Sequence, residues 1–166
     1  MEITEEARTI SRKILNEVGL LYQSAMEIQK AIDEKRTVIL YRNDQIAAFC
    51  IWTFYGDWCE IASLYVEEKF RNLSYLQKII SSIKNRLEPM AKNIFFFTRH
   101  PVIVRIAQGA DFIKVPYWKL PTKVWIKILI HRLHPIRIIS YLKFLKLGLK
   151  IFQLNFSLYI FKKPAV

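Results

Sequence analysis

Residues 60–76 read EIASLYVEEKFRNLSYL, and they join a predicted strand to a predicted helix through a short polar loop. The strand extends from Trp58 to Val66, where β-branched, aromatic and small apolar residues predominate. The helix extends from Ser74 to Leu87, where apolar residues recur at helical spacing until Pro89. We therefore take this strand, loop and helix as the centre of the fold.

The segments on either side of this unit predict a mixed α/β fold. Two amphipathic helices come first, and a hairpin signature then leads into the unit. Residues 152–161 alternate at strand periodicity, so we expect one apolar face on this last strand. The predicted helices outside the unit cover residues 3–21, 24–34 and 101–108, and the predicted strands cover residues 37–41, 45–54, 93–97, 112–120 and 152–161.

This order of elements resembles the GNAT superfamily of acyl-coenzyme A-dependent N-acyltransferases over nearly the whole chain. Residues 60–66 are similar to the family's fourth strand, and residues 71–76 are similar to its Arg/Gln-x-x-Gly-x-Gly/Ala pyrophosphate loop. Gly109 to Phe112 looks like the glycine and phenylalanine that end the next helix and open the sixth strand. The resemblance implies an α/β fold with a mixed central sheet flanked by helices.

The resemblance also implies that the loop binds acetyl-coenzyme A or another acyl-coenzyme A, with no metal. In such a loop, backbone N–H groups and the helix dipole face a pyrophosphate. The motif's glycine positions hold Ser74 and Leu76 here, which restricts the approach of a phosphate, and Ser74 is expected to cap the helix. The residues implied for the pyrophosphate are Arg71, Asn72, Leu73, Ser74, Tyr75 and Leu76, and those for the pantetheine arm are Leu64, Tyr65 and Val66.

Glu60 lies eleven residues before Arg71, where the resemblance places a general base. A carboxylate on a mostly apolar strand is expected to have a raised pKa, which suits it to accept a proton from an amine near neutral pH. The alternative is a solvated glutamate at the strand end, beside Asp57. The family's acid tyrosine corresponds to Arg105 here, and His100 is interpreted as a helix cap rather than a catalyst.

The last 55 residues, 112–166, carry eleven Lys and Arg and no Asp or Glu, so they hold +11 of the total formal charge of +12. This segment is expected to face an anionic partner. Aromatic residues are interleaved with the cations, which favours an anionic membrane surface over nucleic acid.

A basic amphipathic helical insertion is predicted at residues 121–150, between the strands that match the family's sixth and seventh. It consists of two helices that are broken at Pro135, each with a cationic stripe and a wide apolar face. The domain's own sheet, a second subunit in a homodimer, and lipid acyl chains are three alternative covers for the apolar faces. The stripe residues are Lys123, Lys127, His131 and His134 in the first helix and Arg137, Ser140, Lys143, Lys146 and Lys150 in the second.

The chain, residues 1–166, is predicted to form one domain, and its 52% hydrophobic content suits a single core. No secretory signal or membrane-spanning stretch is visible, so we expect a cytoplasmic protein, with peripheral attachment at the inner membrane surface as a further option. Cys50 and Cys59 are expected to be buried thiols.

Two functions stay open at this point. The leading hypothesis is an N-acyltransferase that moves an acetyl or longer acyl group from a coenzyme A or carrier-protein thioester to a small amine or a membrane-proximal amphiphile. The alternative is a catalytically degenerate GNAT-like module that binds a membrane surface or nucleic acid through its basic C-terminal helices. Loss of both loop glycines favours the module, whereas retention of Arg71 and Glu60 favours the enzyme.

Overall fold

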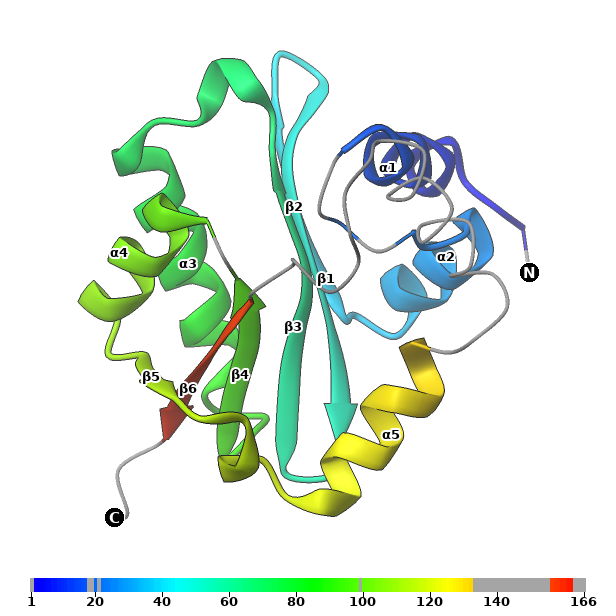
Figure 1. Cartoon of the computed structure of the whole chain (residues 1–166). Helices are drawn as coiled ribbons and strands as arrows, with labels where there is room; N and C mark the ends of the chain where they lie inside the picture. The colour runs from blue at the N-terminus through cyan, green and yellow to red at the C-terminus, as the bar shows by residue number, and fades with distance from the viewer. Residues whose placement is uncertain (1, 18–19, 21, 99, 133–155, 163–166) are drawn as a thin grey trace, which may run out of the picture.

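The computed structural model describes residues 2–17, 20, 22–98, 100–132 and 156–162 of the 166-residue chain. Within these residues a six-stranded sheet runs in the order β1-β2-β3-β4-β6-β5 (Figure 1). β3 and β4 are parallel, and the other neighbouring strands are antiparallel, so the predicted mixed α/β class is confirmed. The strands are β1 (Thr37–Arg42), β2 (Gln45–Tyr55), β3 (Trp58–Val66), β4 (Asn93–Thr98), β5 (Ile113–Val115) and β6 (Ser157–Lys162).

Helices cover both faces of this sheet (Figure 1). Trp52 and Phe96 are buried in the core against α3 and α4, whereas Phe49 is buried against α1 and α2, and Phe95 against α5. Burial on both faces explains the nearly continuous apolar runs of β2 and β4. The helices are α1 (Glu5–Asn16), α2 (Ala25–Asp33), α3 (Leu73–Leu87), α4 (Pro101–Gly109) and α5 (Thr122–Arg132).

The ends of α1 differ from the prediction. The Thr4 hydroxyl accepts a hydrogen bond from the Ala7 N–H at 3.3 Å, so the helix begins at Glu5. Glu17 has extended backbone angles and ends the helix after Asn16. The predicted helix over residues 3–21 was therefore too long at both ends.

The sheet opens between β3 and β4. These strands pair over only three residues each, Trp58–Glu60 against Asn93–Phe95. The register of β3 against β2 also shifts at Ala62, which is the extra residue of a β-bulge. The C-terminal halves of β3 and β4 are thus not hydrogen-bonded to each other, and a cavity can lie between them.

Strand β5 is shorter than the predicted strand over residues 112–120. It ends at Val115 because Pro116 has no N–H to continue a ladder, and a 3₁₀ helix follows at Tyr117–Lys119. The prediction of this strand was wrong in its C-terminal half.

Strand β6 is apolar on both faces, which corrects the expectation of one apolar face. The Tyr159 ring stacks on Phe96 with centroids 5.5 Å apart, on the side of α3 and α4. Leu158 and Ile160 pack on the other side, in the core that α5 covers. A strand between two helical layers needs no polar face.

Helix α5 lies where the first helix of the insertion was predicted. Val124 and Ile128 are buried against the sheet, and Lys123 and Lys127 are exposed. Pro135 and the predicted second helix lie outside the described residues. The two cysteines, Cys50 and Cys59, are free and buried, as predicted.

Candidate functional site

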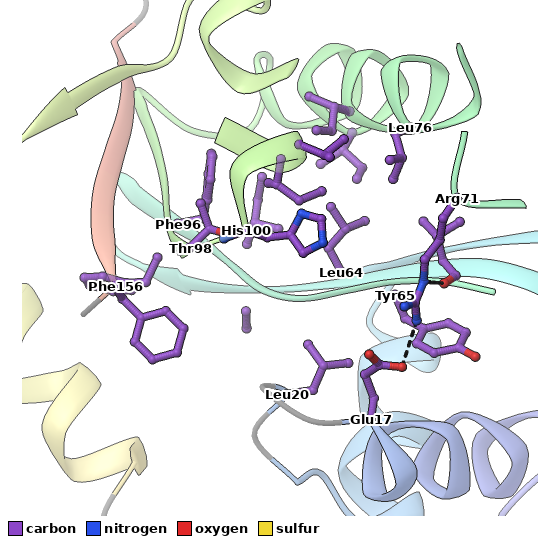
Figure 2. A pocket seen from close by; sticks show the side chains of 18 of the residues that line it. Glu17, Leu20, Leu64, Tyr65, Arg71, Leu76, Phe96, Thr98, His100 and Phe156 are labelled. Carbon is purple, nitrogen blue, oxygen red and sulfur yellow. Dashed lines mark hydrogen bonds and ion pairs between the residues drawn. The ribbon is translucent and has the colours of Figure 1, made fainter. Parts of the chain in front are cut away.

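A cavity of about 570 Å³ lies at the opening between β3 and β4 and extends between α3 and α4 (Figure 2). It reaches from Ile83 of α3 to Leu20, which precedes α2 on the other face of the sheet. Its walls are mostly apolar, with a few polar side chains. The apolar walls include Leu64, Leu76, Ile80, Phe96, Ile103, Phe112 and Phe156, and the polar groups include Glu17, Arg71, Thr98 and His100.

Arg71 is held at one end of this cavity by two hydrogen bonds. Its Nε donates to the carbonyl oxygen of Val66 at 2.7 Å, and its Nη2 donates to Glu17 Oε2 at 2.8 Å (Figure 2). Its side chain is 40% exposed, so the guanidinium is also accessible from solvent. A fixed and accessible guanidinium is suited to bind a phosphate.

Helix α3 begins beside this guanidinium. The Asn72 side chain accepts a hydrogen bond from the Tyr75 N–H at 2.9 Å, so Asn72 is the N-cap. The predicted cap, Ser74, was wrong because the helix begins at Leu73 and Ser74 lies within its first turn. Leu76 is buried and lines the cavity, so an apolar side chain stands at the second glycine position of the motif.

Tyr65 lines the same end of the cavity. Its ring stacks on Phe49 with centroids 5.0 Å apart, and its hydroxyl donates to Glu67 Oε2 at 3.0 Å. Burial, together with this hydrogen bond, raises the pKa of Tyr65 to about 12. The hydroxyl therefore keeps its proton at neutral pH.

Glu60 lies on the face of the sheet that α5 covers. Its side chain is 6% exposed, and its carboxylate accepts hydrogen bonds from the Tyr55 hydroxyl at 3.0 Å and from Arg132 Nη2 at 2.7 Å. The alternative of a solvated glutamate was wrong, because the Glu60 side chain is buried and bonded to Tyr55 and Arg132. Glu60 is thus a buried and fully oriented carboxylate.

Glu60 is one layer of side chains away from the cavity. The residues that line the cavity, among those described, do not include Glu60. They do include Phe97, and the Arg132 guanidinium lies over the Phe97 ring, 4.7 Å from its centroid. The Glu60 and Arg132 pair therefore borders the cavity behind Phe97.

The fold of the chain is similar to that of solved acetyltransferase structures, although no family model and no curated protein matches the sequence. N-acetylglutamate synthase from Neisseria gonorrhoeae aligns with 98% of this chain at a TM-score of 0.63 and 13% identity. The aligned chain spans only 33% of that synthase. Rv2747 from Mycobacterium tuberculosis aligns over 95% of this chain and 94% of its own at a TM-score of 0.68 and 11% identity. A GNAT family acetyltransferase from Staphylococcus aureus aligns over 98% and 96% at a TM-score of 0.55 and 12% identity.

The chain has the GNAT fold. This finding confirms the resemblance at the level of architecture. The residues implied for the pantetheine arm, Leu64 to Val66, all line the cavity, as do Arg71 and Leu76. Glu60 lies behind the wall rather than in it.

Other residues that the sequence did not indicate also line the cavity of this GNAT fold, among them Glu17, Leu20, Thr98 and Phe156. His100, interpreted as a helix cap, occupies the N-cap position of α4 but makes no capping hydrogen bond through its side chain. Its ring lies in the cavity instead (Figure 2). In the described part of the chain, no group of three or more His, Cys, Asp and Glu is arranged to hold a metal ion.

Proposed function

We propose that this protein is an N-acyltransferase that transfers an acetyl or longer acyl group from a coenzyme A thioester to an amine. The observation that carries the proposal is the apolar cavity at the β3–β4 opening, with Arg71 and the start of α3 at one end and the Glu60 pair behind Phe97, which is part of the cavity wall. The solved structures of the Neisseria synthase and of Rv2747 both contain coenzyme A, and the synthase also contains N-acetyl-glutamate. A carrier-protein thioester is the alternative donor.

The proposed donor site extends along β3 to the N-terminus of α3. The pantetheine arm lies against Leu64, Tyr65 and Val66, and the pyrophosphate meets Arg71 and the first turn of α3, Asn72 to Leu76. In this turn the Tyr75 and Leu76 N–H groups are bonded to Asn72, so the N–H groups of Leu73 and Ser74 are the ones proposed for the phosphate. Because Leu76 replaces a glycine, we expect weaker pyrophosphate binding than a glycine loop provides.

The proposed reaction needs a neutral amine. The amine nitrogen attacks the thioester carbonyl carbon, the C–S bond breaks, and the sulfur leaves as the thiolate of coenzyme A, which takes up the second proton that the nitrogen loses as the amide forms. The ammonium proton of the acceptor passes to Glu60, whose carboxylate is oriented by Arg132 and Tyr55. Since Glu60 lies behind Phe97, the proposed transfer requires a water molecule between the amine and the carboxylate.

The test is acyl transfer by the full-length protein. Acetyl-coenzyme A or a long-chain acyl-coenzyme A is incubated with a panel of amines that includes amino acids, polyamines and long-chain amines. Thiol release and the mass of the amide product are measured. Amine-dependent thiol release with a matching amide mass supports the proposal, and thioesters that remain intact with every amine contradict it.

A second candidate function follows from the exposed side of α5 and the turn before it. Trp118 is 81% exposed and Ile130 is 68% exposed, and exposed lysines lie between them. We define the α5 surface as Trp118, Lys119, Lys123, Ile126, Lys127 and Ile130. Exposed aromatic and aliphatic groups among cations favour an anionic bilayer, and each cation near such a surface adds about 1 kcal/mol.

In the described part of the chain, no helix is long and apolar enough to cross a membrane. Attachment through the α5 surface would therefore place the protein at the bilayer face, where a membrane-proximal amphiphile is within reach as acceptor. Binding to phosphatidylserine vesicles is the test, with the K119E/K123E/K127E variant as the change and K30E/K78E/K92E as a matched control. Equal vesicle binding by the two triple variants contradicts membrane docking by α5. If the wild-type protein binds an oligonucleotide more tightly than vesicles, the partner of the α5 surface is a nucleic acid instead of a membrane.

A further inference from the structure

Glu17 and Arg71 join two segments that are 54 residues apart, at the end of the cavity where the donor's phosphates are proposed to bind. The Glu17 carboxylate accepts from Arg71 Nη2 at 2.8 Å, and both side chains line the cavity (Figure 2). Glu17 is the C-cap of α1, and its backbone N–H is bonded to the carbonyl oxygens of Lys13 and Ile14. The backbone of Glu17 is therefore fixed, and its carboxylate reaches Arg71 from this fixed position.

The Arg71 guanidinium stabilises the charge of the Glu17 carboxylate. A carboxylate at a helix C-terminus meets the negative end of the helix dipole, so a nearby cation stabilises it. Lys13, in the last turn of the same helix, is bonded to Glu67, and Glu67 also accepts from the Tyr65 hydroxyl. The Arg71 guanidinium lies over the Tyr65 ring, 6.0 Å from its centroid, so Arg71 belongs to the same cluster as Lys13, Glu67 and Tyr65.

Arg71 is anchored in a way that allows it to exchange partners. Its Nε bond to the Val66 carbonyl oxygen holds the guanidinium in place, while Nη2 is the atom that contacts Glu17. A pyrophosphate beside the start of α3 offers oxygens to the same guanidinium edge. If the Glu17 carboxylate moves away, Arg71 Nη2 can bind a phosphate oxygen of the ligand in its place.

We propose that Glu17 is a gate for the acyl donor, which competes with the donor's pyrophosphate for Arg71. This inference rests on the proposed function, because it requires that a phosphate-bearing donor bind at this loop. In the ligand-free protein the loop's guanidinium is neutralised by Glu17. Donor phosphates must displace this carboxylate, and the charge of Glu17 also repels them.

The size of the effect follows from the exposure of the pair. The side chains of Arg71 and Glu17 are 40% and 32% exposed, so solvent screens their attraction. Removing a competitor of this strength should tighten binding of the donor about two- to fivefold. The dissociation constants of ligands without phosphate should not change when Glu17 is replaced.

The experiment measures dissociation constants of coenzyme A and of pantetheine by calorimetry with the full-length protein. Pantetheine has the same thiol arm and lacks the phosphates. Glu17→Gln and Glu17→Ala are the gate variants, and Glu5→Gln is the matched control, since Glu5 pairs with Arg8 and Arg12 on the outer surface of the same helix. The gate variants should bind coenzyme A about two- to fivefold more tightly, with pantetheine binding unchanged, and the gain should shrink at high salt.

The outcomes separate the gate from the proposed function. Unchanged or weaker coenzyme A binding by both gate variants overturns the gate, as does an equal gain for pantetheine. The gain should also vanish when Glu17→Gln is combined with Arg71→Met, because the gate acts through Arg71. A wild-type protein that binds neither coenzyme A nor pantetheine overturns the proposed function, and the gate with it.

Discussion

Arg132 donates a 2.7 Å hydrogen bond to Glu60 across 72 residues of sequence. The bond connects the last residue of α5 to the middle of the central sheet. Helix α5 is therefore a support for the proposed general base as well as a cover for the sheet. This pair gives the two most direct tests of the catalytic assignment.

Replacing Glu60 with Gln should lower turnover about 10²- to 10⁴-fold, because the amide accepts no proton from the amine. Thiol release from the acyl-coenzyme A, measured between pH 6 and 9 with the best acceptor, checks this expectation. Asp57→Asn is the matched control, since Asp57 is a surface residue three positions away. Full turnover of Glu60→Gln at neutral pH removes Glu60 from the mechanism.

Replacing Arg132 with Met should destabilise the fold by about 1–3 kcal/mol, because the buried Glu60 carboxylate loses a charged partner. Urea unfolding measures the loss. The double variant Glu60→Gln, Arg132→Met should be less destabilised than the sum of the two single changes. Lys127→Met, on the exposed side of α5, is expected to stay within about 0.5 kcal/mol of wild type.

Stability should fall in alkaline solution through Cys59 and Tyr65. Burial is the main cause that raises the pKa of each side chain to about 12, from ordinary values of 9.0 and 10.0. Below pH 9 both groups are protonated in the folded and the unfolded chain, so their contribution is fully present. As the pH rises from 9 to 12 only the unfolded chain loses these protons, and the free energy of unfolding declines.

Urea unfolding at intervals over this pH range measures the decline. The Cys59→Ala variant should show a shallower decline than wild type, because one of the groups with a raised pKa is gone, while Tyr65 and the buried Cys50, whose pKa burial also raises, still contribute. An equal slope in the variant would contradict the assignment to Cys59.

The sequence predicted most elements because their signals are local. The hairpin and the third strand depend on alternation and turn residues, and all three strands were found near the expected bounds. The helix after the loop was predicted one residue late, because Asn72 and Ser74 are both good N-cap residues and only the structure shows that Asn72 makes the bond. The last strand was assigned a single apolar face, because periodicity does not reveal that α5 covers its second face.

The site was predicted in part, for a similar reason. A local motif indicates Arg71 and residues 64–66, and they line the cavity, while their role in donor binding stays a prediction. Glu17 and Arg132 were missed as partners of Arg71 and Glu60, because each contact joins segments more than 50 residues apart. No spacing rule in a single sequence predicts such contacts.

The most direct test of the central claim is the thermal shift of the full-length protein with acetyl-coenzyme A, a long-chain acyl-coenzyme A, and coenzyme A alone. A ligand that binds only the folded state should add about 2.7 kcal/mol of stability at a hundredfold excess over its dissociation constant. Leu64→Trp, which fills the cavity along β3, should lose most of the shift. We predict stabilisation of the wild type by at least one thioester, and no shift with any of the three ligands would contradict coenzyme A thioesters as the donor.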